Sequence, residues 1–133
     1  MWAISRLLPS GEFPIPGRLL LTLTVLAFGV VIAILGVMAF RSANTTVDPR
    51  TPHQSSSLVQ NGVYRYTRNP MYLGFLLILV AWGFYLGSVF AALLLPMFVI
   101  YMNRFQIKPE ERHMRVLFGE AYTRYRSEVR RWL

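Results

Sequence analysis

Two long tracts without a charged residue limit what this chain can fold into. Leu19–Phe40 spans 22 uncharged positions and Met71–Asn103 spans 33. About 20 apolar residues in a helix cross a hydrocarbon core about 30 Å thick, so the first tract predicts one crossing. The second tract is too long for one crossing and just sufficient for two short ones, and Tyr85–Ser88 near its middle supplies turn residues. The chain is therefore predicted to be an all-α integral membrane protein with about three transmembrane helices, one single span and one tight helical hairpin.

Three residues inside these tracts bear on how the helices run. Pro96 lies in the second arm of the hairpin, where we expect a kink whose freed backbone groups need other partners. Gly29 and Gly36 lie seven positions apart on the first helix. They either mark a packing face or are ordinary glycines of a membrane helix.

The charged residues lie outside these tracts, and their number and positions limit which classes of partner the chain can bind. Lys and Arg number 14 against 6 Asp and Glu, which gives a formal net charge of +8. Such a balance raises nucleic acid as a partner. A nucleic-acid module spreads its basic residues over a folded surface and does not exclude them from half of the chain, so we predict no nucleic-acid partner. The chain has no cysteine, which excludes disulfides, thiolate metal sites and cysteine nucleophiles, and we predict no metal.

The positions of the basic residues predict the orientation. The loop between the tracts holds Arg41, Arg50, Arg65 and Arg68, and the tail holds Arg104, Lys108, Arg112, Arg115, Arg124, Arg126, Arg130 and Arg131. Only Arg6 and Arg18 precede the first tract, and the hairpin turn has no basic residue. Basic loops stay on the cytoplasmic side, so loop 41–68 and the C-terminus are predicted to be cytoplasmic. We expect a multi-pass protein of the bacterial inner membrane.

The resulting organisation is one domain over residues 1–133. Its parts are an N-terminal segment (1–18), a transmembrane helix (19–40), a cytoplasmic loop (41–68), a transmembrane hairpin (69–103) and a cytoplasmic tail (104–133).

The segment Gly62–Gly74 (GVYRYTRNPMYLG) is dense in Tyr, Arg and Gly. One interpretation is an interfacial belt, with tyrosines at headgroup depth and arginines that reach lipid phosphates. The other is a binding site. Pro70 can begin a helix, and Arg68 and Asn69 then lie beside exposed helix N–H donors, which suits a carboxylate or phosphate. Gly74, one turn into that helix, allows a ligand or a neighbouring helix to approach closely.

The tail from Pro109 is predicted to be a helix with a break at Gly119. Its apolar residues recur at spacings of three and four, as in a basic amphipathic helix that lies on anionic lipid: Met114, Leu117, Phe118, Tyr122, Tyr125, Val129 and Trp132. Glu110 and Glu111 fit this interpretation less well, because acidic residues gain nothing near an anionic membrane. They either complement the dipole at a helix start or receive the cationic group of a ligand.

Four segments together resemble the isoprenylcysteine carboxyl methyltransferase and phospholipid methyltransferase superfamily. They are GVYRYTRNPMYLG, the apolar hairpin, RFQIKPEER (Arg104–Arg112) and FGEAYTRY (Phe118–Tyr125). The resemblance covers Thr45–Leu133 with order and spacing preserved. It implies an integral membrane enzyme that transfers a methyl group from S-adenosylmethionine and holds this cofactor between its last membrane helices and its tail. The chain also lacks the Gly-rich strand-to-helix signature of a Rossmann fold.

The family's motifs match particular residues of this chain. The Arg-His-Pro-x-Tyr-x-Gly element falls on Arg68, Asn69, Pro70, Tyr72 and Gly74, the paired glutamates on Glu110 and Glu111, and the Phe-Gly-x-x-Tyr element on Phe118, Gly119 and Tyr122. Asn69 stands where many members carry a histidine, so a titrating role there is excluded, although an amide can still hydrogen-bond a cofactor. Gln106 stands where some eukaryotic relatives have an arginine, and their carboxyl-methylating substrate is not carried over.

The resemblance implies which residues bind each part of the cofactor. We expect Arg68 or the nearby helix N-terminus to bind its carboxylate, and Glu110 or Glu111 to bind its ammonium. An aromatic ring is expected to pack on the adenine or face the sulfonium, and the candidates are Tyr64, Tyr66 and Tyr72.

The candidate catalytic residues are Arg104 and Glu111, with Arg104 either orienting an anionic acceptor or reaching lipid phosphates. The other candidate cofactor-binding residues are Tyr64, Tyr66, Arg68, Asn69, Pro70, Tyr72, Gly74 and Glu110.

The expected acceptor is a lipid-like or small apolar molecule that bears a carboxylate, an amine or a thiol and enters sideways from the bilayer. Membrane lipids are the expected partners. The alternative function is non-catalytic: a small membrane protein that binds anionic lipid through its Tyr/Arg belt and basic tail.

Overall fold

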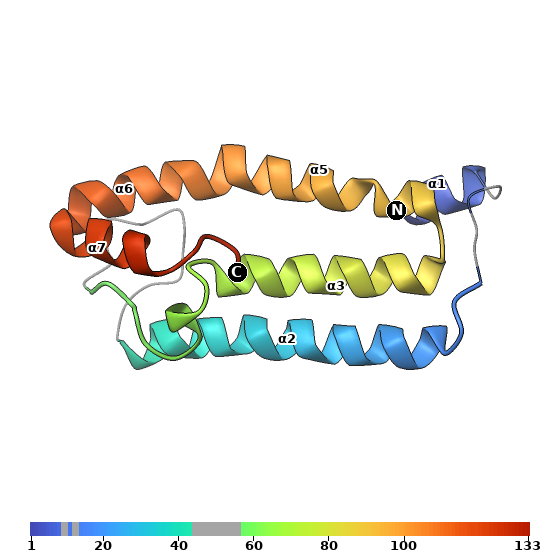
Figure 1. Cartoon of the computed structure of the whole chain (residues 1–133), viewed down its shortest axis with the longest axis horizontal. Coiled ribbons are helices and arrows are strands. Elements are labelled where there is room, and N and C mark those ends of the chain that lie inside the picture. The colour runs from blue at the N-terminus through green and yellow to red at the C-terminus, as the bar shows by residue number, and fades with distance from the viewer. Residues whose placement is uncertain (9–10, 12–13, 44–56) are drawn as a thin grey trace.

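The computed structural model describes residues 1–8, 11, 14–43 and 57–133. Three long helical rods lie side by side, each antiparallel to the one before it (Figure 1). The first two rods are α2 (Arg18–Ser42) and α3 (Pro70–Leu86), and the third consists of α4 (Val89–Ala92), α5 (Leu94–Tyr101), η4 (Met102–Ile107) and α6 (Lys108–Phe118). A short helix, α1 (Trp2–Leu7), contacts α4 at the far end of the rods. The described residues contain no β-strand, so the predicted all-α fold is confirmed.

The lengths and surfaces of the rods suit a membrane. Two helices are long and apolar enough to cross one: α2 and the third rod, which runs for 30 residues from Val89 to Phe118. The 17 residues of α3 span about 26 Å at 1.5 Å per residue, slightly less than a hydrocarbon core. Large apolar side chains such as Leu20 and Phe28 are exposed along α2, which hydrocarbon accommodates and water does not. These findings support membrane association, and the number and direction of the crossings stay predictions.

The first two rods touch at glycines. A Cβ atom added to Gly29 of α2 would lie 2.9 Å from the carbonyl oxygen of Gly74, and one added to Gly74 of α3 would lie 2.6 Å from that of Gly29. A Cβ atom on Gly36 would lie 2.9 Å from Cγ of Met71. Gly29 and Gly36 are buried, as is Thr22 seven positions earlier. The packing face considered for the first helix is therefore confirmed, and the backbones themselves are in contact.

Substitution of Gly74 by Ala is expected to destabilise the protein by about 1–3 kcal/mol, because the new methyl group overpacks this backbone contact. Thermal unfolding in detergent measures the change. Gly83→Ala on the same helix is the matched control. Its Cβ would meet only the flexible end of Met1, at 3.4 Å, and alanine favours a helix by up to about 1 kcal/mol over glycine. Equal melting temperatures for the two variants would contradict the contact.

The hairpin turn forms where its residues predict it. Gly87, with φ at +60°, adopts the left-handed conformation that favours glycine, and its N–H donates to the carbonyl of Gly83 at 3.0 Å. Ser88 then caps α4, and its Oγ accepts the N–H of Ala91 at 3.4 Å. These two residues reverse the chain between α3 and the third rod.

The third rod continues past the point where a new helix was expected. It is interrupted at Leu93, three residues before Pro96, as expected near that proline. Pro109 lies in the first turn of α6, as predicted, but Ile107 before it is already helical (φ −69°, ψ −46°). The π-helical segment η4 ends two residues before Pro109. A proline ring clashes with the turn before it in a regular α-helix, and the wider π-helical turn gives it more room. Because α6 has no free end here, helix-start electrostatics does not explain the acidic pair.

The tail folds back on the rods. Gly119, with φ at +53°, ends α6, and α7 (Glu120–Glu128) returns toward the start of α3 (Figure 1). This confirms the predicted break, and the contact of the tail with a lipid surface stays a prediction. Tyr122 and Tyr125 of α7 are buried, and the hydroxyl of Tyr125 donates to the carbonyl of Tyr64 at 2.7 Å. Tyr64 belongs to η3 (Gly62–Arg65), within the predicted loop 41–68. The first two residues of that predicted loop belong to α2 instead, and residues 44–56 lie outside the described residues.

Candidate functional site

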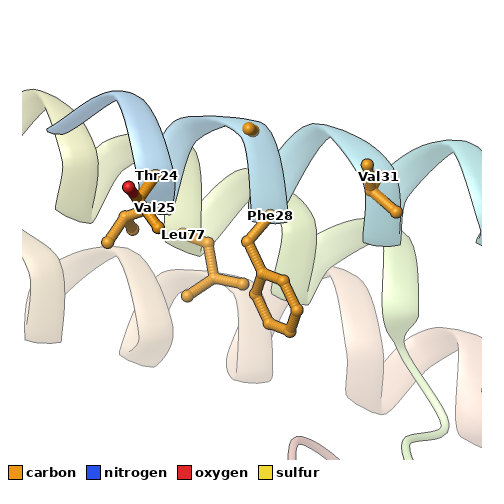
Figure 2. A pocket seen from close by; sticks show the side chains of 6 residues that line it. Thr24, Val25, Phe28, Val31 and Leu77 are labelled. Carbon is orange, nitrogen blue, oxygen red and sulfur yellow. The ribbon is translucent and has the colours of Figure 1, made fainter. Parts of the chain in front are cut away.

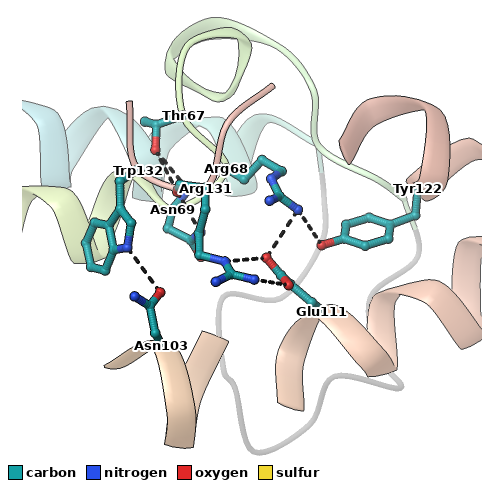
Figure 3. A network of polar contacts seen from close by, with 8 residues as sticks. All are labelled: Thr67, Arg68, Asn69, Asn103, Glu111, Tyr122, Arg131 and Trp132. Atoms are coloured by element: carbon teal, nitrogen blue, oxygen red, sulfur yellow. Dashed lines mark hydrogen bonds and ion pairs between the residues drawn. The ribbon is translucent and has the colours of Figure 1, made fainter. Parts of the chain in front are cut away.

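A cluster of charged and polar side chains lies at the end of the rods where α3 begins (Figure 3). Its main parts come from three segments that are distant in the sequence: Thr67–Asn69 before α3, Glu110–Glu111 on α6, and Arg131–Trp132 after α7. The rods and α7 add single polar side chains: Tyr72, Asn103, Gln106 and Tyr122. Pro70 begins α3, as predicted, and this fixes Arg68 and Asn69 beside the first turn of that helix. The folded-back tail supplies the third segment.

Glu111 is the centre of the cluster. Its carboxylate receives a forked pair of hydrogen bonds from Arg131, from Nε to Oε1 at 2.9 Å and from Nη2 to Oε2 at 2.8 Å. Nη1 of Arg68 lies 3.2 Å from the same Oε1. Only 11% of the Glu111 side chain is exposed. One shielded carboxylate therefore lies between two guanidinium groups.

Arg68 is the more deeply buried of the two arginines, with 9% of its side chain exposed. Its Nη1 also donates to the hydroxyl of Tyr122 at 3.3 Å. Its Nε–H is buried and has no hydrogen-bond partner among the described residues. A buried donor without a partner costs about 1–3 kcal/mol, so this position favours an acceptor atom of a ligand or a water molecule.

Backbone contacts hold the C-terminal segment in place. The carbonyl of Arg131 accepts hydrogen bonds from Nδ2 of Asn69 at 2.9 Å and from Oγ1 of Thr67 at 3.3 Å. The N–H of Arg68 donates to the carbonyl of Arg130 at 3.0 Å. Nε1 of Trp132 donates to Oδ1 of Asn103 at 3.1 Å, which joins the segment to the third rod (Figure 3).

Glu110 points to different partners from Glu111. Its Oε1 accepts hydrogen bonds from the hydroxyl of Tyr72 and from Nε2 of Gln106, each at 2.6 Å. The first contact joins α6 to α3. The second involves Gln106, the residue that stands where some eukaryotic relatives have an arginine. Glu110 thus links the two helices on which the predicted motifs lie.

The two carboxyl groups, which lie beyond the uncharged tract that ends at Asn103, have opposite pKa shifts. Burial raises the pKa of Glu110 above its ordinary value, and the charge of Glu111 adds to this, while the hydrogen bonds from Tyr72 and Gln106 oppose it. Burial alone would raise the pKa of Glu111 too, but the hydrogen bonds and charges of its two arginines outweigh burial and lower it. Glu111 therefore stays ionised to a lower pH than an ordinary glutamate, and Glu110 retains its proton to a higher pH.

The stability of Glu110→Gln relative to the unaltered chain is expected to increase as the pH rises above about 4, the ordinary pKa of a glutamate. The folded chain holds the Glu110 proton to a higher pH than the unfolded chain does, so this contribution to stability is present at low pH and is lost as the pH rises through the raised pKa. Glutamine keeps the acceptor for Tyr72 and removes the titration. Melting temperatures across this range measure the effect. A difference between the two proteins that does not vary with pH would contradict it.

The structure does not bring all predicted site residues together. Tyr64 is buried against Phe40, with ring centres 5.3 Å apart, and Gly74 packs on α2, so packing accounts for both. Tyr66 is 76% exposed. Arg104 is exposed and has no hydrogen bond or ion pair with the other described residues. The residues that do meet are Arg68, Asn69, Glu110, Glu111 and Tyr72, next to Pro70.

Sequence reasoning missed the contributions of Thr67, Asn103, Arg131 and Trp132. Arg131 resembles the other tail arginines in sequence, and its partner Glu111 lies 20 positions away. The exclusion of charge from Met71–Asn103 hid Asn103, which we treated as the last residue of an apolar tract. The only sequence signal for Arg131 was Glu111 itself, because a shielded carboxylate needs a basic partner in the folded chain.

A separate apolar groove lies on the rods (Figure 2). It measures about 480 Å³ and is lined by Thr24, Val25, Ala27, Phe28, Val31 and Leu77. Phe28 and Leu77 project toward the same side of the α2–α3 pair. Gly36 of α2 contacts the start of α3, close to the charged cluster. Val31, the groove residue of α2 nearest to Gly36, is five positions away, so the groove begins about 8 Å along α2 from the start of α3.

The arrangement suits a ligand that carries both charges. Glu111 can receive an ammonium group, and the buried Nε–H of Arg68 can receive a carboxylate oxygen. No group of three or more side chains suited to a metal ion occurs in the described part of the chain.

Fold and cluster together define a small helical protein of membrane type with a shielded, charged centre at one end of its apolar rods. The model of the family described as phospholipid methyltransferase matches residues 18–121, and the chain belongs to this family. Its membership supports a membrane methyltransferase function.

Two relatives are similar to parts of the chain. Over 63 residues the chain is 48% identical to a protein of Haemophilus influenzae that is named only as uncharacterized, and this covers 47% of the chain and 100% of that protein. Over 72 residues it is 32% identical to the protein-S-isoprenylcysteine O-methyltransferase of Schizosaccharomyces pombe, which covers 54% of the chain and 30% of that enzyme. The chain thus spans less than a third of the yeast enzyme. No solved structure matches the chain significantly.

Proposed function

We propose that this protein transfers a methyl group from S-adenosylmethionine to a lipid-like or small apolar acceptor at the membrane–cytosol interface. The observation that carries this proposal is the shielded Arg68–Glu111 pair, in which the Nε–H of Arg68 is left for a ligand. An ion pair taken out of water costs more than it returns unless it is fully satisfied, so its incomplete pairing favours a binding role over a structural one. Membership in a family of methyltransferases supplies the chemistry.

The cofactor's charged groups fit the two sides of this pair. Glu111 receives the ammonium, and Arg68 receives the carboxylate with the first turn of α3 behind it. Asn69, Pro70 and Tyr72 line the same corner in this proposal. When bound, S-adenosylmethionine supplies an activated methyl group on a sulfonium. Tyr64 and Gly74, which packing accounts for, and the exposed Tyr66 are not part of the site that we propose.

The protein's own task is positioning. An in-line displacement needs the nucleophile, methyl carbon and sulfur held in line and water kept away, more than it needs a strong acid or base. Tyr72, Gln106 and Glu110 form a bonded bridge between α3 and α6 beside Glu111. This bridge fixes the distance between the two helices that hold the cofactor's charged groups.

The acceptor enters from the side of the apolar groove in this proposal. Val25, Phe28, Val31 and Leu77 offer a surface for a hydrocarbon chain, and the groove begins within two helical turns of the level at which α3 starts. The reactive end of the acceptor bears a carboxylate, an amine or a thiol. In this proposal the exposed Arg104 contacts an anionic headgroup of the acceptor rather than the cofactor. Lateral entry fails if the purified protein methylates only water-soluble acceptors.

The distribution of basic residues supports the remaining parts of the proposal. The charged cluster lies at the end of the rods that carries the arginine-rich tail, and basic segments stay in the cytoplasm. We therefore place the site and the C-terminus on the cytoplasmic face, in the inner membrane of a bacterium. The cofactor then reaches the site from the cytosol.

The exposed Arg65, Tyr66 and basic tail residues fit the alternative function, a belt that binds anionic lipid. Arg68 does not, because a belt arginine reaches outward to phosphates and this one is turned inward against Glu111. Calorimetric titration of S-adenosylmethionine into the detergent-purified protein separates the two functions. Saturable binding, followed by transfer of labelled methyl to an extract of membrane lipids, is the expected result. A folded protein that binds anionic vesicles and no cofactor would establish the lipid belt instead.

A further inference from the structure

The ammonium position of the proposed cofactor site is already occupied by the chain itself. Both carboxylate oxygens of Glu111 accept from the guanidinium of Arg131, at 2.9 and 2.8 Å. The guanidinium fork covers both oxygens and Nη1 of Arg68 lies 3.2 Å from Oε1, so a third cation cannot take the position that the fork occupies. An ammonium group therefore cannot reach Glu111 on that side while the Arg131 side chain stays in place (Figure 3).

Of the two arginines at Glu111, Arg131 is the one that can leave. Its side chain is 27% exposed against 9% for Arg68, so its guanidinium returns to water at a smaller cost. Arg68 has a further bond to Tyr122, whereas the Arg131 guanidinium bonds only to Glu111 among the described residues.

The movement would involve a side chain and not the tail. The backbone carbonyl of Arg131 stays fixed by Thr67 and Asn69, and Trp132 stays fixed by Asn103. None of these contacts uses the Arg131 guanidinium. The segment can thus remain folded while the guanidinium rotates away from Glu111.

We propose that Arg131 is an internal competitor for the ammonium position, and that S-adenosylmethionine binds by displacing its side chain from Glu111. This inference rests on the proposed function and assigns to the same site a means of regulating its affinity. The apparent affinity for the cofactor is then reduced by the fraction of molecules in which Arg131 occupies Glu111. Any influence that draws Arg131 away, such as an anionic lipid headgroup nearby, raises the affinity.

The test is calorimetric titration of the full-length Arg131→Gln variant in detergent with two ligands. S-adenosylhomocysteine carries the ammonium, and 5′-methylthioadenosine lacks the whole amino-acid group. Loss of the competitor is expected to tighten binding of the first by about threefold to fivefold, the upper part of the range for a partly exposed ion pair. Binding of the second is expected to stay unchanged. Arg130→Gln, which removes the same charge from an exposed neighbour, is the matched control and is expected to change neither affinity.

Each other outcome is decisive. Weaker binding of S-adenosylhomocysteine to Arg131→Gln would mean that Arg131 positions Glu111, which overturns the inference and leaves the proposed function intact. Equal tightening of both ligands would mean general loosening and would overturn it as well. Arg131→Lys retains the charge without the fork, so about twofold tightening is expected, and weaker binding there counts equally against the inference. No binding of S-adenosylhomocysteine by any of these proteins would overturn both the inference and the proposed function.

Discussion

Glu111→Gln is expected to weaken the binding of S-adenosylmethionine by about 30- to 100-fold. The substitution removes the anion that receives the cofactor's ammonium, and a charge-assisted hydrogen bond in a shielded site contributes about 2–3 kcal/mol. Stability is expected to fall less, by about 1–2 kcal/mol, because the glutamine oxygen still accepts one bond from Arg68 or Arg131. Calorimetric titration measures the first effect, and thermal unfolding in the same detergent measures the second.

Glu128→Gln is the control for this result. Glu128 is exposed at the end of α7 and has no ion pair with the other described residues, yet its replacement changes the net charge by the same amount. It is expected to leave affinity and stability unchanged. Unaltered affinity in Glu111→Gln, in a protein that melts cooperatively, would remove Glu111 from the proposed site.

Arg68→Lys is expected to weaken cofactor binding by about 30-fold and to destabilise the protein by about 2 kcal/mol. Lysine keeps the charge but cannot contact Glu111 and Tyr122 together, and it has no counterpart of the buried Nε–H. Because the net charge is conserved, the loss reports on geometry rather than on the general attraction between a basic protein and an anionic group. Titration of S-adenosylmethionine and thermal unfolding are the measurements.

Arg65→Lys is the matched substitution three positions earlier. Arg65 is exposed at the end of η3, so its replacement by lysine is expected to change neither quantity. If both variants bind the cofactor normally, the contact between Arg68 and the cofactor carboxylate is wrong. If both variants also bind anionic vesicles as the unaltered chain does, the arginines serve the lipid belt through their charge.

Local patterns were sufficient to predict much of the fold. Absence of charge over Leu19–Phe40 predicted α2, Gly87 and Ser88 predicted the hairpin turn, Pro70 predicted the first residue of α3, and Gly119 predicted the break in the tail. Each of these signals acts within a few residues, through hydropathy or through the limits that Pro and Gly place on the backbone. For the same reason they are readable without knowledge of the tertiary structure.

The site was predictable only in part, because its bonds connect distant segments. Asn69 and Arg131 are separated by 62 positions and Trp132 and Asn103 by 29, and no local pattern distinguishes Arg131 from Arg130. The continuity of the third rod was missed for a different reason. Pro109 has the chemistry of a helix start, but the π-helical η4 allows the preceding helix to run into it. The tertiary contacts of α6 override the local preference.

The close approach of Gly29 and Gly74 divides the molecule mechanically. With no side chain between their backbones, α2 and α3 cannot slide past each other without collision, and they behave as a single stiff plate. The third rod is joined to that plate at Gly87 and Ser88 and, at the opposite end, by the bonds around Glu110 and Glu111. Ligands that alter those bonds therefore act on the third rod at the end farthest from the hairpin turn that joins it to α3. A bound cofactor would set the distance between the third rod and the α2–α3 pair at this end of the molecule.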